Sequence, residues 1–321
     1  MRAITYARHG GPEVMTWDEV AVPTCHRKGI LIGVEAVSVE GGDLLDRSGN
    51  FAPLAAEPLI IGRQAAGVIL EVGDDAPGFK VGQRAVGVRP NGSHAEIFAA
   101  PARTSWLIPQ ALSTEMAAAL PIAFATAHDA LHHYGRLQAG ETVLIQAGAS
   151  GVGIAAIQLA RTAGAGLILA TGSSDERLAR LRAFGLDHGI NYRTANLAEE
   201  VARLTSGRGV DVLLETVGGD SMQASIDSMA RGGRLVAIGQ ASRAPVLVDL
   251  KQIYARGIIL SGFRLDIASD RIHGAVTAIL AQAARGEVEV VLDRTFSLED
   301  TAAAHAYVES RAAFGRVILH T

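Results

Sequence analysis

The stretch that decides the fold is Gln146-Ala147-Gly148-Ala149-Ser150-Gly151-Val152-Gly153. It follows residues 141–147, which predict a strand, and it opens residues 151–163, which predict a helix. Glycines let a backbone approach a pyrophosphate closely, and a helix N-terminus offers N–H groups and a partial positive charge. The glycines are spaced GxxGxG, and a strand–turn–helix frame is the context that a dinucleotide site requires. The alternative is a tight turn without a ligand.

Short apolar strands alternate with helical segments beyond this turn. This alternation predicts a parallel sheet with helices on both faces, and strands that are apolar throughout fit burial on both faces. The predicted strands span 166–171, 189–192, 210–215 and 233–239, and the predicted helices span 175–184, 195–205 and a segment from Asp220.

The two ends of the chain have a different rhythm. Apolar runs such as Ile30–Val39 and Ala66–Val72 are broken by turn residues, as in β structure. Helical signals are sparse until Ser113, a polar cap before an apolar stretch. We therefore expect a domain at 119–262 inserted between two parts of a first domain, 1–118 and 263–321. The C-terminal elements are predicted as a strand at 257–262, a helix at 270–285, a strand at 288–293, a helix at 298–309 and a closing strand at 315–320.

Composition narrows the class of protein. The chain has 321 residues, 49% of them hydrophobic, and a formal charge of −4. This balance provides no strong field to attract nucleic acid or an anionic membrane. No stretch approaches the roughly 18 to 20 apolar residues of a membrane span, and the N-terminus lacks the apolar run of a signal peptide. With a single cysteine, Cys25, the chain cannot form an internal disulfide, and we expect it in the cytoplasm.

The end of the second predicted strand bears on the choice of dinucleotide. An NAD site usually places an acidic residue there to hold the ribose 2′-OH. Here Thr171 is followed by glycine and serines, and Ser173 and Arg177 could bind a 2′-phosphate instead. Asp175 and Glu176 count slightly against this, although both suit the first turn of a helix. We therefore expect NADP(H).

Motifs along the whole chain carry a family resemblance. They include GGPEVMTWDEV (10–20), VEAVSVEGGDLLDRSG (34–49), GFKVGQRAVGV (78–88), GSHAEIFAAPA (92–102), ALPIAFATAHDAL (119–131) and GRGVDVLLETVGGD (207–220). With these the chain resembles the medium-chain dehydrogenase/reductase superfamily, in its zinc-independent quinone oxidoreductase branch, which includes ζ-crystallin. The resemblance implies an α/β protein with a GroES-like, mainly-β catalytic domain and a Rossmann domain. It also implies hydride transfer from NADPH to a small molecule, a quinone or another conjugated carbonyl compound.

The resemblance also implies positions for the cofactor. Ser150, Gly151, Val152, Ser173, Arg177 and Tyr192 would hold the phosphates and the adenosine end, and Thr126, Thr216, Val217, Ile238, Gly239 and Gln240 would lie along the ribose and nicotinamide. A homodimer is implied as well, made through the edge of the Rossmann sheet at the strand Gly257–Gly262.

The resemblance argues against zinc. The segment that carries a cysteine ligand in zinc-dependent relatives reads Glu40-Gly41-Gly42-Asp43, and the segment with the histidine ligand reads Gly62-Arg63-Gln64. An arginine does not ligate a metal and repels one. The four-cysteine loop of structural zinc is missing. We expect no bound metal.

Candidates for the charge and proton chemistry are Glu40, Arg63 and His128, with Phe51, Asp43 and His94 as pocket residues. Glu40 could act as an acid, Arg63 could stabilise an enolate, and His128 lies on a helix that faces the cleft in relatives. For the first two, a structural ion pair between Glu40 and Arg63 is favoured over catalysis. Asp43 is expected to cap the turn Leu44–Arg47. The proton could also come from water.

Two other functions stay open. One is an NADPH-binding protein with little catalytic activity, which the altered pocket allows. The other is a carbonyl or alcohol oxidoreductase, which is disfavoured because no metal is expected to polarise a C=O group. The sequence does not identify the substrate.

Overall fold

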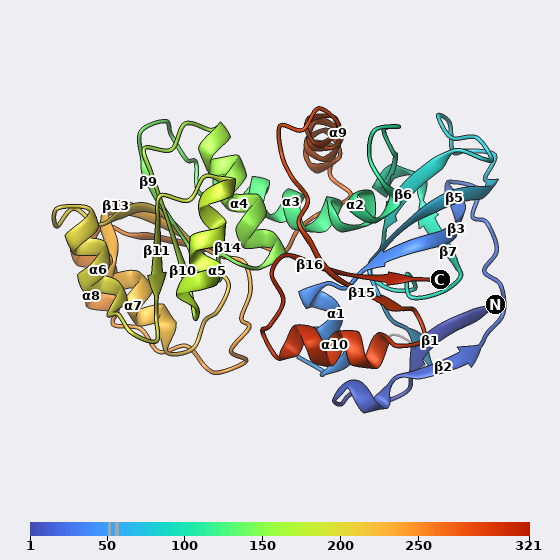
Figure 1. Cartoon of the computed structure of the whole chain (residues 1–321), viewed down its shortest axis with the longest axis horizontal. Helices are drawn as coiled ribbons and strands as arrows, with labels where there is room; N and C mark the ends of the chain where they lie inside the picture. The colour runs from blue at the N-terminus through green and yellow to red at the C-terminus, as the bar shows by residue number, and fades with distance from the viewer. Residues whose placement is uncertain (51–52, 55–57) are drawn as a thin grey trace. The chain divides into compact units, whose positions relative to one another are not determined.

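The computed structural model describes residues 1–50, 53–54 and 58–321. It divides into two compact units, Met1–Ile122 with Asp266–Thr321, and Ala123–Leu265 (Figure 1). The division falls a few residues after each expected domain boundary. One reason is that the backbone N–H of Ile122 donates to the side chain of Gln64, which ties the start of the connecting helix to the first unit. Among the described residues, no helix is long and apolar enough to cross a membrane.

The second unit is a six-stranded parallel sheet in the order β11-β10-β9-β12-β13-β14. The first strand along the chain, β9, lies in the middle, and the order reverses beside it, as in doubly wound dinucleotide-binding sheets. The predicted α/β class is confirmed. The strands are β9 (Thr142–Ile145), β10 (Leu167–Gly172), β11 (His188–Asn191), β12 (Val210–Glu215), β13 (Met229–Ala237) and β14 (Ile259–Gly262).

Side chains explain how helices cover this sheet. Leu144 is in register with both Leu169 and Leu213, and Leu213 with Leu235, so one row of leucines crosses four strands on one face. The row packs into a core with residues of α6 and α7. The helical segments of this unit are α3 (Pro121–His128), η3 (Asp129–Tyr134), α4 (Gly151–Thr162), α5 (Asp175–Arg180), η4 (Leu181–Phe184), α6 (Leu197–Leu204), α7 (Ser221–Asp227) and α8 (Leu250–Arg256).

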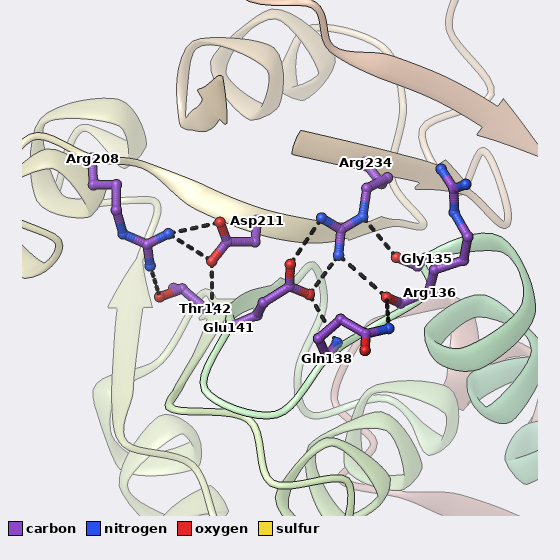
Figure 2. A network of polar contacts seen from close by, with 8 residues as sticks. All are labelled: Gly135, Arg136, Gln138, Glu141, Thr142, Arg208, Asp211 and Arg234. Carbon is purple, nitrogen blue, oxygen red and sulfur yellow. Dashed lines mark hydrogen bonds and ion pairs between the residues drawn. The ribbon is translucent and has the colours of Figure 1, made fainter. Parts of the chain in front are cut away.

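Ion pairs close the amino-terminal side of the sheet (Figure 2). Arg234 donates through two nitrogens to the Glu141 carboxylate, and through Nε to the carbonyl of Gly135 at 2.9 Å. Arg208 binds Asp211 at 2.6 Å, and Asp211 in turn accepts from the backbone of Thr142 at 2.8 Å. These contacts join the starts of β9 and β12 and tie β13 to the segment that leads into β9.

The first unit is built mainly from antiparallel strands. A seven-stranded sheet has the order β15-β16-β3-β5-β6-β8, with β7 also paired to β3, and a second sheet has the order β2-β1-β4. The strands are β1 (Arg2–Tyr6), β2 (Thr16–Glu19), β3 (Gly29–Ser38), β4 (Leu59–Ile60), β5 (Gln64–Val72), β6 (Arg84–Val88), β7 (Ile97–Pro101), β8 (Ser105–Leu107), β15 (Leu292–Ser297) and β16 (Arg316–His320). The helical segments are η1 (Pro12–Val14), α1 (Gly41–Arg47), α2 (Thr114–Ala119), η2 (Ala102–Thr104), α9 (Asp270–Ala284) and α10 (Thr301–Glu309).

The pairing of β16 with β3 brings distant residues together. The two strands are antiparallel, with Ile318 opposite Ser38, and the N–H of Val39 donates to the carbonyl of Val317 at 3.0 Å. Continuing this register by two residues on each strand sets Arg316 opposite Glu40. The closing strand of the chain therefore supplies a cation to the segment that leads into α1.

Some predicted elements shift. The strand expected at 288–293 lies at Leu292–Ser297, because Val288 and Val290 are buried outside the ladder with β16. The segment expected as one helix over 175–184 changes after Arg180 to a 3₁₀ turn. The shift of the strand shows that apolar periodicity predicts burial more reliably than it predicts strand pairing.

Candidate functional site

The phosphate turn is shaped by glycine and by one strained residue. Ala147 has a left-handed φ of 52°. A side chain at Gly153 would place its Cβ 2.5 Å from the carbonyl oxygen of Ala147, so only glycine fits there. Ser150 is the N-cap of α4 and accepts from the N–H of Gly153 at 3.0 Å. Gly151 and Val152 then occupy the first helical positions, whose N–H groups have no carbonyl in a preceding turn and can bind a phosphate.

The end of β10 gathers the residues expected at the adenosine. The guanidinium of Arg177 lies 3.4 Å from the hydroxyl oxygen of Ser173. The N–H of Tyr192, just past β11, donates to the carbonyl of Gly172 at 3.1 Å, and half of its side chain is exposed. Asp175 is bound by the amide of Asn191 at 3.0 Å. A guanidinium and a hydroxyl thus lie together where an NAD site has a carboxylate.

Two loops lie side by side at the ends of β12 and β13. The N–H of Ala241 donates to the carbonyl of Thr216 at 3.0 Å, and the N–H of Ser242 to that of Val217 at 2.9 Å. The N–H of Ile238 donates to the carbonyl of Glu215, and Gly239 lies against Thr216. The side chain of Gln240 bonds within its own loop, to the carbonyl of Ala244. We call the phosphate turn, the end of β10 and these two loops the dinucleotide edge.

Glu40 is placed differently from the expectation. Its carboxylate, almost fully buried, forms an ion pair with Arg316 and accepts from the amide of Gln64 at 2.5 Å. Arg316 also donates to the hydroxyl of Ser38 at 2.6 Å. The expected pair between Glu40 and Arg63 was therefore wrong, because the register of β16 on β3 supplies a nearer cation.

Arg63 instead contacts two other carboxylates. Its Nε lies 3.5 Å from Asp43, and its terminal nitrogen pairs with Asp46. Burial raises the pKa of Asp43 to about 8, with Arg63 opposing the rise and Asp46 adding to it. Asp43 accepts from the N–H of Glu40 at 2.9 Å, as the third helical residue of a capping box. Glu40, rather than Asp43, is thus the N-cap of α1. We call Glu40, Asp43, Arg63 and Arg316 the buried charge cluster.

The histidines differ in setting. His94 is fully buried against Gly62, and burial lowers its pKa to about 3. Its ring meets the buried His305 edge-on at 5.8 Å. His128 packs on His132 at 4.7 Å between ring centroids. Thr126 lies two residues before His128 on α3, and such residues point to opposite sides of a helix. Phe51 lies outside the described residues.

Sequence reasoning missed several polar residues that the structure brings together. Arg316 and Ser38 are 278 residues apart in the sequence, and only the pairing of β16 with β3 joins them. Gln146, Thr171, Glu215 and Ser225 form a buried row beneath the dinucleotide edge. The polar residues at the ends of three neighbouring predicted strands could have indicated this row. Within residues 1–50, 53–54 and 58–321, no group of three or more histidine, cysteine or acidic side chains is arranged to hold a metal ion.

Comparisons with known proteins agree with this architecture. The family model of the alcohol dehydrogenase GroES-like domain matches residues 26–110, and that of the zinc-binding dehydrogenases matches residues 151–296. Quinone oxidoreductase of Sus scrofa is 31% identical, over 99% of this chain and 97% of the relative. The structure of Escherichia coli quinone oxidoreductase complexed with NADPH is 27% identical, with a TM-score of 0.93 and full coverage of both chains. A solved NAD-dependent alcohol dehydrogenase is 28% identical, with a TM-score of 0.93 and full coverage of both.

Matches over nearly the whole length of both chains, together with the reversed strand order and the GxxGxG turn, confirm the predicted resemblance. The chain belongs to the medium-chain dehydrogenase/reductase superfamily, in its quinone oxidoreductase branch.

Proposed function

We propose that the protein is an NADPH-dependent reductase that transfers hydride to a quinone or another activated α,β-unsaturated carbonyl compound. The observation that supports NADPH as the cofactor is the contact of Arg177 with Ser173 at the end of β10. A cation and a hydroxyl suit a 2′-phosphate, whereas a ribose 2′-OH favours a carboxylate acceptor. The NADPH complex of the E. coli relative supports the same choice.

Replacing the guanidinium tests this choice of cofactor. We expect Arg177→Ala to weaken NADPH binding by roughly ten- to a hundredfold, the cost of a charge-assisted hydrogen bond, and to leave NADH binding almost unchanged. Fluorescence titration with both dinucleotides measures the two affinities, and Arg180→Ala, in the next helical turn, is the matched control. Equal losses for NADPH and NADH would refute the assignment to a 2′-phosphate.

The protein's role in this reaction is to bind the dinucleotide and to orient its nicotinamide toward the acceptor. The first amides of α4 would hold the pyrophosphate, and the loops after β12 and β13 would lie along the ribose and nicotinamide. Bound NADPH supplies the hydride, so the protein needs to add only orientation and charge stabilisation. Loss of absorbance at 340 nm with a panel of quinones, enones and aldehydes identifies the acceptor class. Turnover of aldehydes alone would overturn the proposal.

We propose that the reaction needs no zinc. At the two positions where zinc-dependent relatives have ligands, Glu40 is engaged by Arg316 and Gln64, and Arg63 is a cation. A divalent ion at this place would have to displace one guanidinium and tolerate another. Activity that survives extensive chelation, with less than one-tenth equivalent of zinc by elemental analysis, is the expected result. Activity restored only by added zinc would refute it.

We propose water as the proton source. Glu40 and Arg63 are held in ion pairs, and His128 packs on His132 on the side of α3 opposite Thr126. We therefore expect Glu40→Gln and His128→Gln to leave the shape of the pH–rate profile unchanged. A profile that loses a limb in either variant would make that residue the proton donor.

Two alternative functions can be tested in the same way. The solved NAD-dependent alcohol dehydrogenase favours an alcohol or carbonyl oxidoreductase, which would oxidise alcohols with NAD⁺ or NADP⁺. A binding protein with little activity would hold NADPH tightly and reduce no member of the panel.

We further propose a homodimer through β14. This strand ends the order of its sheet, and Ile259 and Leu260 on it are nearly half exposed. Leu250 and Tyr254 on α8 are exposed as well. An apolar edge strand of this kind pairs readily with a second copy. Light scattering should give twice the mass of the chain, and Leu260→Lys should halve it. A monomeric wild type would refute the proposal.

A further inference from the structure

A row of buried polar side chains crosses the strand ends beneath the dinucleotide edge. It runs from β10, past the end of β9, to β12 and α7. Each of its four members is at most 3% exposed: Thr171, Gln146, Ser225 and Glu215. Buried polar groups are costly unless they are hydrogen-bonded, so their pairing has to be complete.

The direction of the hydrogen bonds is set at Glu215. One carboxylate oxygen accepts from the N–H groups of Val217 at 2.8 Å and Gly218 at 2.9 Å. The other accepts from the hydroxyl of Ser225 at 2.6 Å. A carboxylate only accepts, so the proton of Ser225 is committed to Glu215. The oxygen of Ser225 is then left to accept from elsewhere.

The remaining bonds follow from this commitment. The amide nitrogen of Gln146 donates to Ser225 at 2.8 Å, which turns the amide oxygen of Gln146 toward Thr171. Thr171 donates to that oxygen, and its own oxygen accepts from the N–H of Ala147 at 3.2 Å. Ala147 is the left-handed residue of the phosphate turn. One directed chain of hydrogen bonds therefore joins the carboxylate after β12 to the backbone of the turn after β9.

We propose that Glu215, acting through Ser225 and Gln146, is a positioning residue for the dinucleotide. At one end of the chain it fixes the N–H groups of the loop after β12, and at the other it holds the N–H of Ala147. The role rests on the proposed dinucleotide binding. This series of hydrogen bonds supports the parts of the site that NADPH and NADH share. Its loss should therefore weaken the binding of both dinucleotides equally.

Exchanging the amide and the carboxylate tests the directed chain. In Glu215→Gln the amide oxygen stays with Val217 and Gly218, so NH₂ groups face Ser225 from both sides and the hydroxyl proton of Ser225 has no acceptor. In Gln146→Glu two carboxylates compete for the one proton of Ser225. The double variant satisfies every group again, with the bonds through Ser225 reversed. In cofactor-free protein we expect each single variant to lower Tm by about 3 to 10 °C, and the double variant to regain at least half of the summed loss. A decrease in Tm of the double variant that equals or exceeds the sum of the two single decreases would refute the proposed direction of the hydrogen bonds.

Dinucleotide affinity tests the positioning role. We expect each single variant to weaken NADPH and NADH alike, by about tenfold, and the double variant to regain most of this loss. Ser228→Ala is the matched control, because Ser228 follows Ser225 by one turn of α7 and its buried hydroxyl donates to the carbonyl of Ala224 and not to a member of the row. It should leave both affinities unchanged.

The outcomes separate the two proposals. Recovery of Tm with affinities that never change would overturn the positioning role and leave a purely structural chain. A wild type that binds neither dinucleotide would refute the proposed function and the positioning role with it, whereas the Tm cycle in cofactor-free protein would still report on the hydrogen bonds.

Discussion

The dinucleotide edge and the buried charge cluster solve the same physical problem in different ways. In each, a carboxylate is buried: Glu215 lies beneath the dinucleotide edge, before the loop that follows β12, and Glu40 lies at the start of α1. Glu215 is satisfied by two backbone N–H groups two and three residues ahead and by one hydroxyl. Glu40 is satisfied by a guanidinium from the last strand of the chain. The first arrangement is local and neutral around its carboxylate, whereas the second depends on a long-range ion pair.

The difference predicts where each region is vulnerable. A buried ion pair is costly to break from one side, because the remaining charge stays in a medium of low polarity. A carboxylate held by backbone N–H groups keeps those partners whatever happens to distant side chains. The buried charge cluster should therefore dominate the stability of the fold, and the dinucleotide edge should dominate affinity for its ligand.

Removing the cation at position 316 is the strongest test of this contrast. We expect Arg316→Met to lower the free energy of unfolding by about 3 to 5 kcal/mol, because Glu40 is left buried without a counter-ion. Urea unfolding at pH 7 measures the loss. The double variant Glu40→Gln/Arg316→Met, which removes both charges, should recover at least half of it. A loss below 1 kcal/mol in the single variant would remove the distinction between the two regions.

The pH dependence of Asp43 is the next largest effect. Its folded-state pKa, about 8, lies above the value of about 4 for an unfolded chain. The folded protein thus holds a proton that the unfolded chain has lost, and this contribution to stability disappears as pH rises from about 4 to 8. Asp43→Asn mimics the protonated form. As pH rises from 5 to 7, the free energy of unfolding of this variant should therefore increase relative to that of the wild type by about 1 kcal/mol per pH unit. Parallel curves would mean that Arg63 keeps Asp43 ionised.

The same contrast explains what the sequence could predict. The turn at 146–153 and the strand alternation depend on neighbours within a few residues, and the structure has them as expected. Ser173 and Arg177 are also close in sequence, and the structure brings the guanidinium within 3.4 Å of the hydroxyl oxygen. The partner of Glu40 depends on the register of β16 against β3, which no local pattern encodes. Arg63 is the partner that the resemblance suggests, because it and Glu40 stand where zinc-dependent relatives have ligands, whereas Arg316 is the partner in the structure because the sheet places it opposite Glu40.

The buried row beneath the dinucleotide edge shows a second limit. Gln146, Thr171 and Glu215 each lie at the end of a predicted strand or one residue before it, so their closeness could have been inferred from a parallel sheet. The direction of their hydrogen bonds could not, because it depends on Ser225 of α7 reaching between two of them. Side-chain geometry, rather than pattern, decides such contacts.

His94 gives a pH effect of opposite sign beside the same cluster. Its folded-state pKa of about 3 lies below the ordinary value of about 6.5, so the folded protein binds fewer protons than the unfolded chain. Its contribution to stability is present above pH 6.5 and is lost as pH falls toward 3. Relative to His94→Gln, the wild type should lose about 2 kcal/mol of unfolding free energy between pH 6.5 and 5. Urea unfolding at both pH values measures this, and an unchanged difference would show that His94 is protonated in the fold.

The smallest expected effect returns to the dinucleotide edge, at Ala147. A left-handed backbone costs an alanine about 1 kcal/mol, which glycine avoids, but glycine also loses more chain entropy on folding. The two terms nearly cancel, so Ala147→Gly should change the free energy of unfolding by less than about 1 kcal/mol. Its backbone N–H still donates to Thr171, so NADPH affinity should fall by no more than about twofold. Urea unfolding and fluorescence titration measure the two quantities. A large loss of affinity without a loss of stability would mean that the methyl group of Ala147, and not only its backbone, holds the turn in its binding shape.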